Sequence, residues 1–176
     1  MWKTRNSSPY LQPGRLNDVL AAIQTMALYR YYRASVDGWA ELISNSKGNK
    51  EDEQRWREVF NDHPEFIRRS VLHHDHYALV WRRALPSHCH YITKAIITSE
   101  EYNKLSDEEK NSYSRPQVPE SQIKTLMDLA ITLHQRAIDQ SRDWRWWIAP
   151  AIAAASSFIG ALIGGLASIG AQLLKH

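Results

Sequence analysis

The sequence predicts a mainly helical α+β protein with three parts: a cytosolic domain that holds a small β-hairpin, a long connecting helix and one C-terminal transmembrane helix. Three observations support this prediction. Apolar residues recur every three or four positions through much of residues 15–71 and again through residues 119–143, which is typical of helices. Residues 77–97 are instead rich in aromatic and β-branched side chains, which favour strands. From Trp146 to Leu174 the chain carries no charge, which is typical of a membrane span.

Four helices are expected in the first part of the domain. A face of apolar residues predicts the first helix over about residues 15–34, and Ser35 can cap a short second helix. The third helix is expected over about residues 53–60. Pro64 suits the first turn of a new helix, so a short fourth helix is predicted to run to about Val71.

The strand-rich segment is expected to form a hairpin. Residues 77–83 are predicted to pair with residues 90–97 around a turn at Pro86-Ser87-His88. Two capping boxes follow, Thr98-x-x-Glu101 and Ser106-x-x-Glu109, and each predicts the start of a short polar helix.

Two resemblances accompany this order of elements. Helices followed by a two-stranded hairpin resemble a winged helix-turn-helix over residues 15–97, which places a winged-helix-like domain at residues 15–118. The chain also resembles short uncharacterised bacterial proteins with a C-terminal hydrophobic tail. These share His-Pro-Glu-Phe, Val-Trp-Arg-Arg and Arg-Trp-Trp-Ile, found here at residues 63–66, 80–83 and 145–148. Neither resemblance implies an activity.

The N-terminal residues do not resemble a secretory signal. Residues 1–14 are predicted to be a flexible arm without the apolar core that a secretory signal needs, so export of the folded domain is not expected.

The single cysteine, Cys89, excludes an internal disulfide and suits a reducing compartment. A net charge of +3 is compatible with an anionic lipid or nucleic acid and requires neither.

The C-terminal part is predicted to be an amphipathic connecting helix over residues 119–145 and a membrane anchor over residues 146–176. A helix over residues 148–174 would rise about 40 Å, which is enough to cross a hydrocarbon core of about 30 Å. Arginine and tryptophan at the border of this helix predict a membrane interface on the cytoplasmic side. These interface residues are Arg142, Trp144, Arg145, Trp146 and Trp147. The protein is therefore expected to be a single-pass protein of the cytoplasmic membrane, with its N-terminal domain in the cytoplasm.

Small residues mark one face of the predicted anchor. Ser156, Gly160, Gly164 and Ser168 recur at a spacing of four, which would let two helices approach closely. A lipid bilayer and a second copy of the chain are therefore the expected partners. Few residues of the tail are strongly apolar, so a buried hairpin of a soluble assembly and a conditionally inserting helix stay as alternatives.

The densest group of potential metal ligands is a set of histidines with one cysteine. His73, His74 and His76 precede one predicted strand, and His88, Cys89 and His90 precede the other. If the hairpin forms, these side chains meet at one end, where imidazoles and a thiolate could hold zinc. Their spacing matches no standard zinc site, and Cys89 lacks the glycine-rich turn of a catalytic nucleophile. No Walker loop, dinucleotide fingerprint or paired-carboxylate motif occurs, so no catalytic residue, metal ligand or cofactor is predicted.

Arg68, Arg69, Arg82 and Arg83 are the clearest basic feature. In the winged-helix interpretation the first pair ends a recognition helix and the second pair lies on the wing, where they could bind phosphates. Lipid headgroups and ordinary solvated faces are the alternatives. Acidic residues at 51–53 and 107–109 weaken the local positive potential, so nucleic acid is not the favoured partner.

These observations predict a non-enzymatic, membrane-tethered interaction module that recognises an unidentified protein and self-associates through its C-terminal span. Two alternatives belong to other classes. One is a membrane-disrupting defence or toxin effector whose tail assembles into a pore. The other is a membrane-bound winged-helix regulator that binds nucleic acid.

Overall fold

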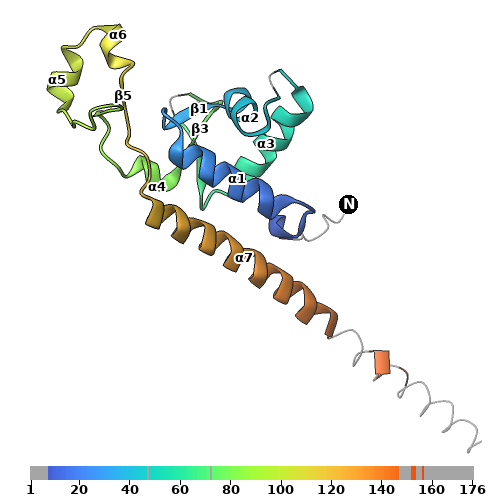
Figure 1. Ribbon diagram of the computed structural model, residues 1–176. Coiled ribbons are helices and arrows are strands. Elements are labelled where there is room, and N and C mark those ends of the chain that lie inside the picture. Colours follow the sequence, from blue (N-terminus) through green and yellow to red (C-terminus); the bar gives the residue numbers. More distant parts are fainter. Residues whose placement is uncertain (1–7, 47, 72, 147–151, 154–155, 157–176) are drawn as a thin grey trace, which may run out of the picture. The chain divides into compact units, whose positions relative to one another are not determined.

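A computed structural model describes residues 8–46, 48–71, 73–146, 152–153 and 156, with only the backbone described over residues 143–146. The chain divides into two units, residues 1–134 and residues 135–176. The first part of unit 1 consists of η1 (Pro9–Leu11), α1 (Arg15–Leu28), β1 (Arg33–Ser35), α2 (Val36–Ser44), α3 (Lys50–Asp62), β2 (Ile67–Arg69) and β3 (His76–Leu79) (Figure 1). The chain continues through α4 (Val80–Arg83), β4 (Cys89–His90), α5 (Ser99–Asn103), α6 (Asp107–Lys110), β5 (Tyr113–Ser114) and α7 (Glu120–Trp146).

A three-stranded antiparallel sheet in the order β1-β3-β2 lies at the centre of unit 1. In the central strand, Ala78 pairs with Arg33 of β1 on one side and with Arg68 of β2 on the other. Residues directly opposite one another in antiparallel strands have side chains on the same face. The sheet therefore presents Arg33, Ala78 and Arg68 in one row.

Helices α1, α2 and α3 pack around this sheet and enclose the core with it (Figure 1). In α1, Val19, Ile23 and Met26 are fully buried at a helical spacing. The other large buried side chains of this core are Trp39, Trp56, Phe60, Phe66, Ile67, Tyr77 and Leu79. The indole N–H of Trp39 donates to the carbonyl of Tyr77 over 3.0 Å, so its polar group is satisfied inside the core.

Helix starts with local signals lie where the sequence predicts them. The Ser35 hydroxyl accepts a hydrogen bond from the amide of Gly38, and α2 begins at the next residue. Both capping boxes form, and they begin α5 and α6. These two helices lie between β4 and β5, which pair antiparallel to each other. The predicted long helix is confirmed as α7.

Arg82 is a buried cation surrounded by backbone carbonyl groups. Its side chain is fully buried, and its guanidinium donates to five carbonyl oxygens at distances of 2.8 to 3.3 Å. The acceptors are Met26, Arg30, Tyr31, Arg115 and Pro116. Burial lowers the pKa of Arg82 to about 10, so the group stays charged at neutral pH. These bonds join the end of α1 and the segment between α1 and β1 to α4 and to the segment that follows β5.

The predicted hairpin of residues 77–83 and 90–97 is wrong. Strand β3 ends at Leu79, and α4 begins at the next residue. The hydrogen bonds from the Arg82 side chain to backbone carbonyls favour this helical turn, although residues 77–83 have a high strand propensity. The hairpin partner of β3 is β2, in the segment predicted as the fourth helix. Residues 91–96 are exposed, so their β-branched side chains gain little from strand pairing; only Cys89 and His90 form β4.

None of the helices in the described ranges combines the length and the apolar character needed to cross a membrane. This finding contradicts the predicted transmembrane helix, the tail anchor and the single-pass location in the cytoplasmic membrane. The long described helix, α7, carries charged residues along its whole sequence. Trp147, Gly160, Gly164 and Ser168, on which the interface and packing predictions partly depend, lie outside the described residues.

The remaining predicted interface and packing positions are only partly described. Arg142 is exposed on α7, and the backbones of Trp144, Arg145 and Trp146 are helical. Ser156 donates a hydrogen bond from its hydroxyl to the carbonyl of Ile152 over 2.8 Å.

Part of the predicted flexible arm is held by a small polar cluster. Tyr10 of η1 is buried; its hydroxyl donates to a carboxylate oxygen of Glu65 over 2.6 Å, and Nδ1 of His63 lies 3.2 Å from the same oxygen. Burial and the bond to Glu65 raise the pKa of Tyr10. Burial opposes ionisation of Glu65, but the hydrogen bonds with His63 and Tyr10 outweigh it and lower the pKa of Glu65 below its ordinary value of 4.5.

Replacing Arg82 with Met should destabilise the protein strongly. The substitution leaves five buried carbonyl groups without their donor, and we expect a loss of about 3 to 5 kcal/mol in the free energy of unfolding. Arg83→Met, at the exposed neighbour, should stay within about 0.5 kcal/mol of wild type. Chemical denaturation of both variants measures the difference, and equal stability of the two would contradict the structural role of Arg82.

The bonds at Glu65 should make stability depend on pH. The folded state favours ionised Glu65, so this stabilisation is present above pH 4.5 and is lost as the pH falls through the lower folded-state pKa. The difference in unfolding free energy between wild type and Glu65→Gln should therefore be larger at neutral pH than in acid. Urea denaturation at about pH 7 and about pH 3.5 measures it. Glu108→Gln, at an exposed glutamate of α6, is the control, and a Glu65→Gln difference that does not change with pH would refute the interpretation.

Candidate functional site

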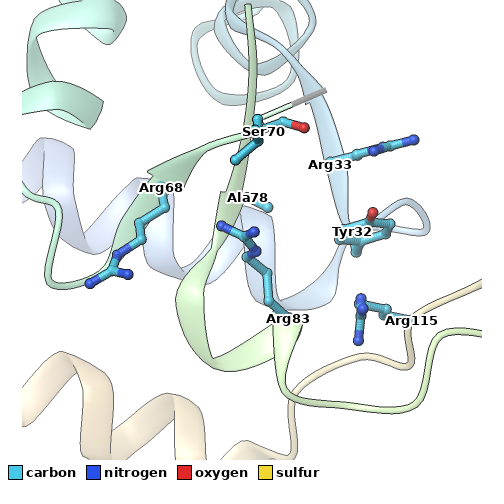
Figure 2. A pocket seen from close by; sticks show the side chains of 8 residues that line it. Tyr32, Arg33, Arg68, Ser70, Ala78, Arg83 and Arg115 are labelled. Carbon is cyan, nitrogen blue, oxygen red and sulfur yellow. The ribbon is translucent and has the colours of Figure 1, made fainter. Parts of the chain in front are cut away.

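A pocket of about 210 Å³ opens on the exposed face of the central sheet, and four arginines line it. We call it the arginine pocket: Arg33, Arg68, Arg83 and Arg115, with Tyr32, Ser70, Val71 and Ala78 completing the lining. In Figure 2, Arg83 rises from α4 toward Ala78, with Arg68 on one side and Tyr32, Arg33 and Arg115 on the other. Five separate stretches of chain thus bring their side chains to one small space.

The sheet register creates the floor of this pocket. Arg33 and Arg68 flank Ala78 across the three strands, and the methyl side chain of Ala78 leaves a depression between two long side chains. The chain enters α4 directly after β3, which puts Arg83 close to the same floor. The depression therefore depends on a small residue at the centre of a row of arginines.

Tyr32 organises the opposite wall. The guanidinium carbon of Arg33 lies 5.4 Å from the centre of the Tyr32 ring, and that of Arg115 lies 5.2 Å from it. Both distances suit cation–π contacts. The amide of Tyr32 also donates to the Ser114 hydroxyl over 3.2 Å, which ties this wall to β5.

The positive charge of the pocket is not neutralised within the described part of the chain. No aspartate or glutamate lines the pocket, and none of its four arginines forms an ion pair among the described residues. Three other arginines do form ion pairs: Arg15, Arg55 and Arg57 each lie within 4.0 Å of an aspartate or glutamate oxygen. The arginine pocket thus brings four arginines without a described ion pair to one small space.

The four arginines predicted from the sequence do not act together. Arg68 and Arg83 line the arginine pocket. Arg69 is exposed on β2 but does not line the pocket, because successive strand residues face opposite sides of the sheet. Arg82 is buried, with its donors engaged by backbone carbonyls, so its guanidinium cannot reach a ligand.

Sequence reasoning missed Tyr32, Arg33 and Arg115. Tyr32 and Arg33 fall within the predicted first helix, about residues 15–34, whereas in the structure Arg33 begins β1. Arg115 precedes a proline between two elements and belongs to no motif. The strand register and the hydrogen bond from Arg82 to the Arg115 carbonyl help to bring these residues beside Arg68 and Arg83.

The histidine and cysteine cluster does not form a metal centre in the described part of the chain. Strand β3 pairs with β1 and β2, and β4 pairs with β5, so the hairpin expected to join the two histidine groups is not formed. Among the described residues, no three histidine, cysteine or carboxylate side chains are placed to hold a metal ion. Cys89 is buried, with its sulfur 3.6 Å from the carbonyl oxygen of Lys94.

Comparison with known proteins adds no relative: no protein-family model, curated protein or solved structure matches this chain. The chemistry of the arginine pocket is therefore inferred from the geometry and charge of its own residues.

Proposed function

We propose that this chain is a non-enzymatic binding module that holds a phosphate-bearing ligand in its arginine pocket. The observation that carries the proposal is the convergence of four arginines on one small space that no carboxylate lines. Four like charges so close together are unfavourable without a counterion, and a multiply charged anion relieves their repulsion.

The side chains of the arginine pocket suit phosphate more than a single carboxylate. A guanidinium donates two parallel hydrogen bonds to a phosphate or a carboxylate, and several such groups can surround a phosphate, which has more acceptor oxygens. The hydroxyls of Tyr32 and Ser70 add uncharged donors at the same pocket. A volume of about 210 Å³ is smaller than most pockets for drug-sized ligands and suits one anionic group of a larger molecule.

The lining supports binding without chemistry. Among the described residues that line the arginine pocket there is no histidine, cysteine or carboxylate to serve as a general base or a nucleophile. A guanidinium stays protonated at neutral pH and cannot accept a proton there.

A winged-helix interpretation offers another surface, but its charge argues against it. The order α1-β1-α2-α3-β2-β3 is similar to that of a winged helix-turn-helix, in which α3 would enter the DNA major groove. Helix α3 carries three basic and five acidic residues, a net charge of −2, and the DNA backbone would repel it. Its two arginines, Arg55 and Arg57, are already paired with carboxylates. We therefore place ligand recognition at the arginine pocket.

Substitution of Arg68 tests the proposal. In calorimetric titrations of the full chain at low ionic strength, wild type should bind inorganic pyrophosphate, and Arg68→Gln should weaken that binding about tenfold. Such a loss corresponds to about 1.4 kcal/mol, at the lower end of the range for a hydrogen bond to a charged group.

Arg69→Gln is the matched control because it removes the same charge from the next residue of the same strand, outside the pocket. This variant should keep the wild-type affinity for pyrophosphate. Equal losses for the two variants would show only a general effect of net charge and would contradict the proposed site. Failure of the wild type to bind would also refute it.

A further inference from the structure

A second cavity adjoins the arginine pocket and shares part of its wall. It measures about 350 Å³, and Tyr32, Arg33 and Arg115 line both spaces. We call it the aromatic pocket, because Tyr31, His88, Tyr102 and Tyr113 also line it. A ligand whose anionic group lies among the arginines can therefore extend past Tyr32 into a space bordered by rings.

The rings of the aromatic pocket already include a stacked pair. The centres of the His88 and Tyr102 rings lie 4.0 Å apart with an angle of 20° between their planes. Tyr113 meets Tyr102 edge to face, at 6.1 Å and 82°. The three rings come from the loop before β4, from α5 and from β5, so the lobe between β4 and β5 supplies most of this surface.

Polar groups of the aromatic pocket suit a flat heterocycle. Asn111 and Ser87 provide side chains that can donate and accept hydrogen bonds at a ring edge. No carboxylate lines this pocket among the described residues. Lys110 lines it too, with its ammonium group 3.6 Å from a carboxylate oxygen of Asp107. The volume of about 350 Å³ falls within the range of small-molecule sites.

We propose that the ligand is a nucleotide, with its phosphates in the arginine pocket and its base in the aromatic pocket. The inference rests on the proposed phosphate site and names the ligand class for it. Bases stack on aromatic side chains and on arginine planes, and positively charged grooves with such rings bind single-stranded nucleic acids. A free nucleotide and a nucleotide unit of a single strand share this chemistry.

The test compares two ligands that differ only by a nucleoside. Inorganic pyrophosphate and uridine diphosphate are titrated into the full chain. Uridine diphosphate should bind about tenfold more tightly, because the base adds a stacking interaction. Tyr102→Leu should remove this advantage and leave the affinity for pyrophosphate unchanged.

Tyr91→Leu is the control, since Tyr91 is an exposed aromatic residue of the same lobe that does not line the aromatic pocket. The Tyr91→Leu variant should bind pyrophosphate and uridine diphosphate with the affinities of the wild type. Circular dichroism shows whether Tyr102→Leu is folded. If it is not, His88→Leu removes the other ring of the stacked pair and provides the same comparison.

The outcomes separate the two proposals. Binding of pyrophosphate with no gain for uridine diphosphate, or a gain that Tyr102→Leu and His88→Leu both retain, overturns the nucleotide inference and leaves the phosphate site. Absence of pyrophosphate binding overturns the proposed function itself. A phosphoserine peptide that binds more tightly than uridine diphosphate also overturns the nucleotide inference.

Titration with an oligothymidylate at low and at high salt identifies the source of the nucleotide. An oligothymidylate of about eight nucleotides that binds more tightly than uridine diphosphate, with an affinity that falls steeply as salt rises, supports a single-stranded nucleic acid. An oligothymidylate that binds as tightly as uridine diphosphate or more weakly supports a free nucleotide.

Discussion

The fully buried guanidinium of Arg82 holds together segments that are far apart in the sequence. It reaches the carbonyls of Met26, Arg30 and Tyr31 on one side and those of Arg115 and Pro116 on the other. A single side chain with five donors can satisfy so many acceptors only if all of them converge on it. The burial of this cation is tolerable because hydrogen bonds replace its hydration.

The arginine pocket is a consequence of this convergence. The carbonyl oxygens of Tyr31 and Arg115 accept hydrogen bonds from Arg82. The side chains of these two residues or of their neighbours then line the arginine pocket and the adjoining cavity. The buried arginine is thus a positioning residue, and the four arginines that line the pocket are the groups available to a ligand. This division of roles explains why Arg82 and Arg83, adjacent in sequence, have opposite surroundings.

The parts of this protein that could be predicted are those with local causes. The Ser35 cap, the two capping boxes and the apolar stripe of α7 depend on residues within a few positions of one another, and the corresponding helices form. Residues 77–83 have strand-forming composition, but the distant carbonyl partners of Arg82 decide that the strand ends at Leu79. The pocket combines predicted residues, Arg68 and Arg83, with Arg33 and Arg115, which only the tertiary structure brings to them. The uncharged tail indicated a membrane span, and no described helix meets that requirement.

In our proposal Arg82 positions the site, and the four arginines of the pocket bind the ligand. A nitrogen-15 NMR spectrum of the arginine side chains, recorded with and without inorganic pyrophosphate, tests it directly. We expect the Nε–H signal of Arg82 to exchange slowly with solvent and to keep its position when pyrophosphate is added. The Nε–H signals of the pocket arginines should shift; these are Arg33, Arg68, Arg83 and Arg115. Rapid exchange at Arg82, or shifts confined to arginines outside the pocket, would contradict it.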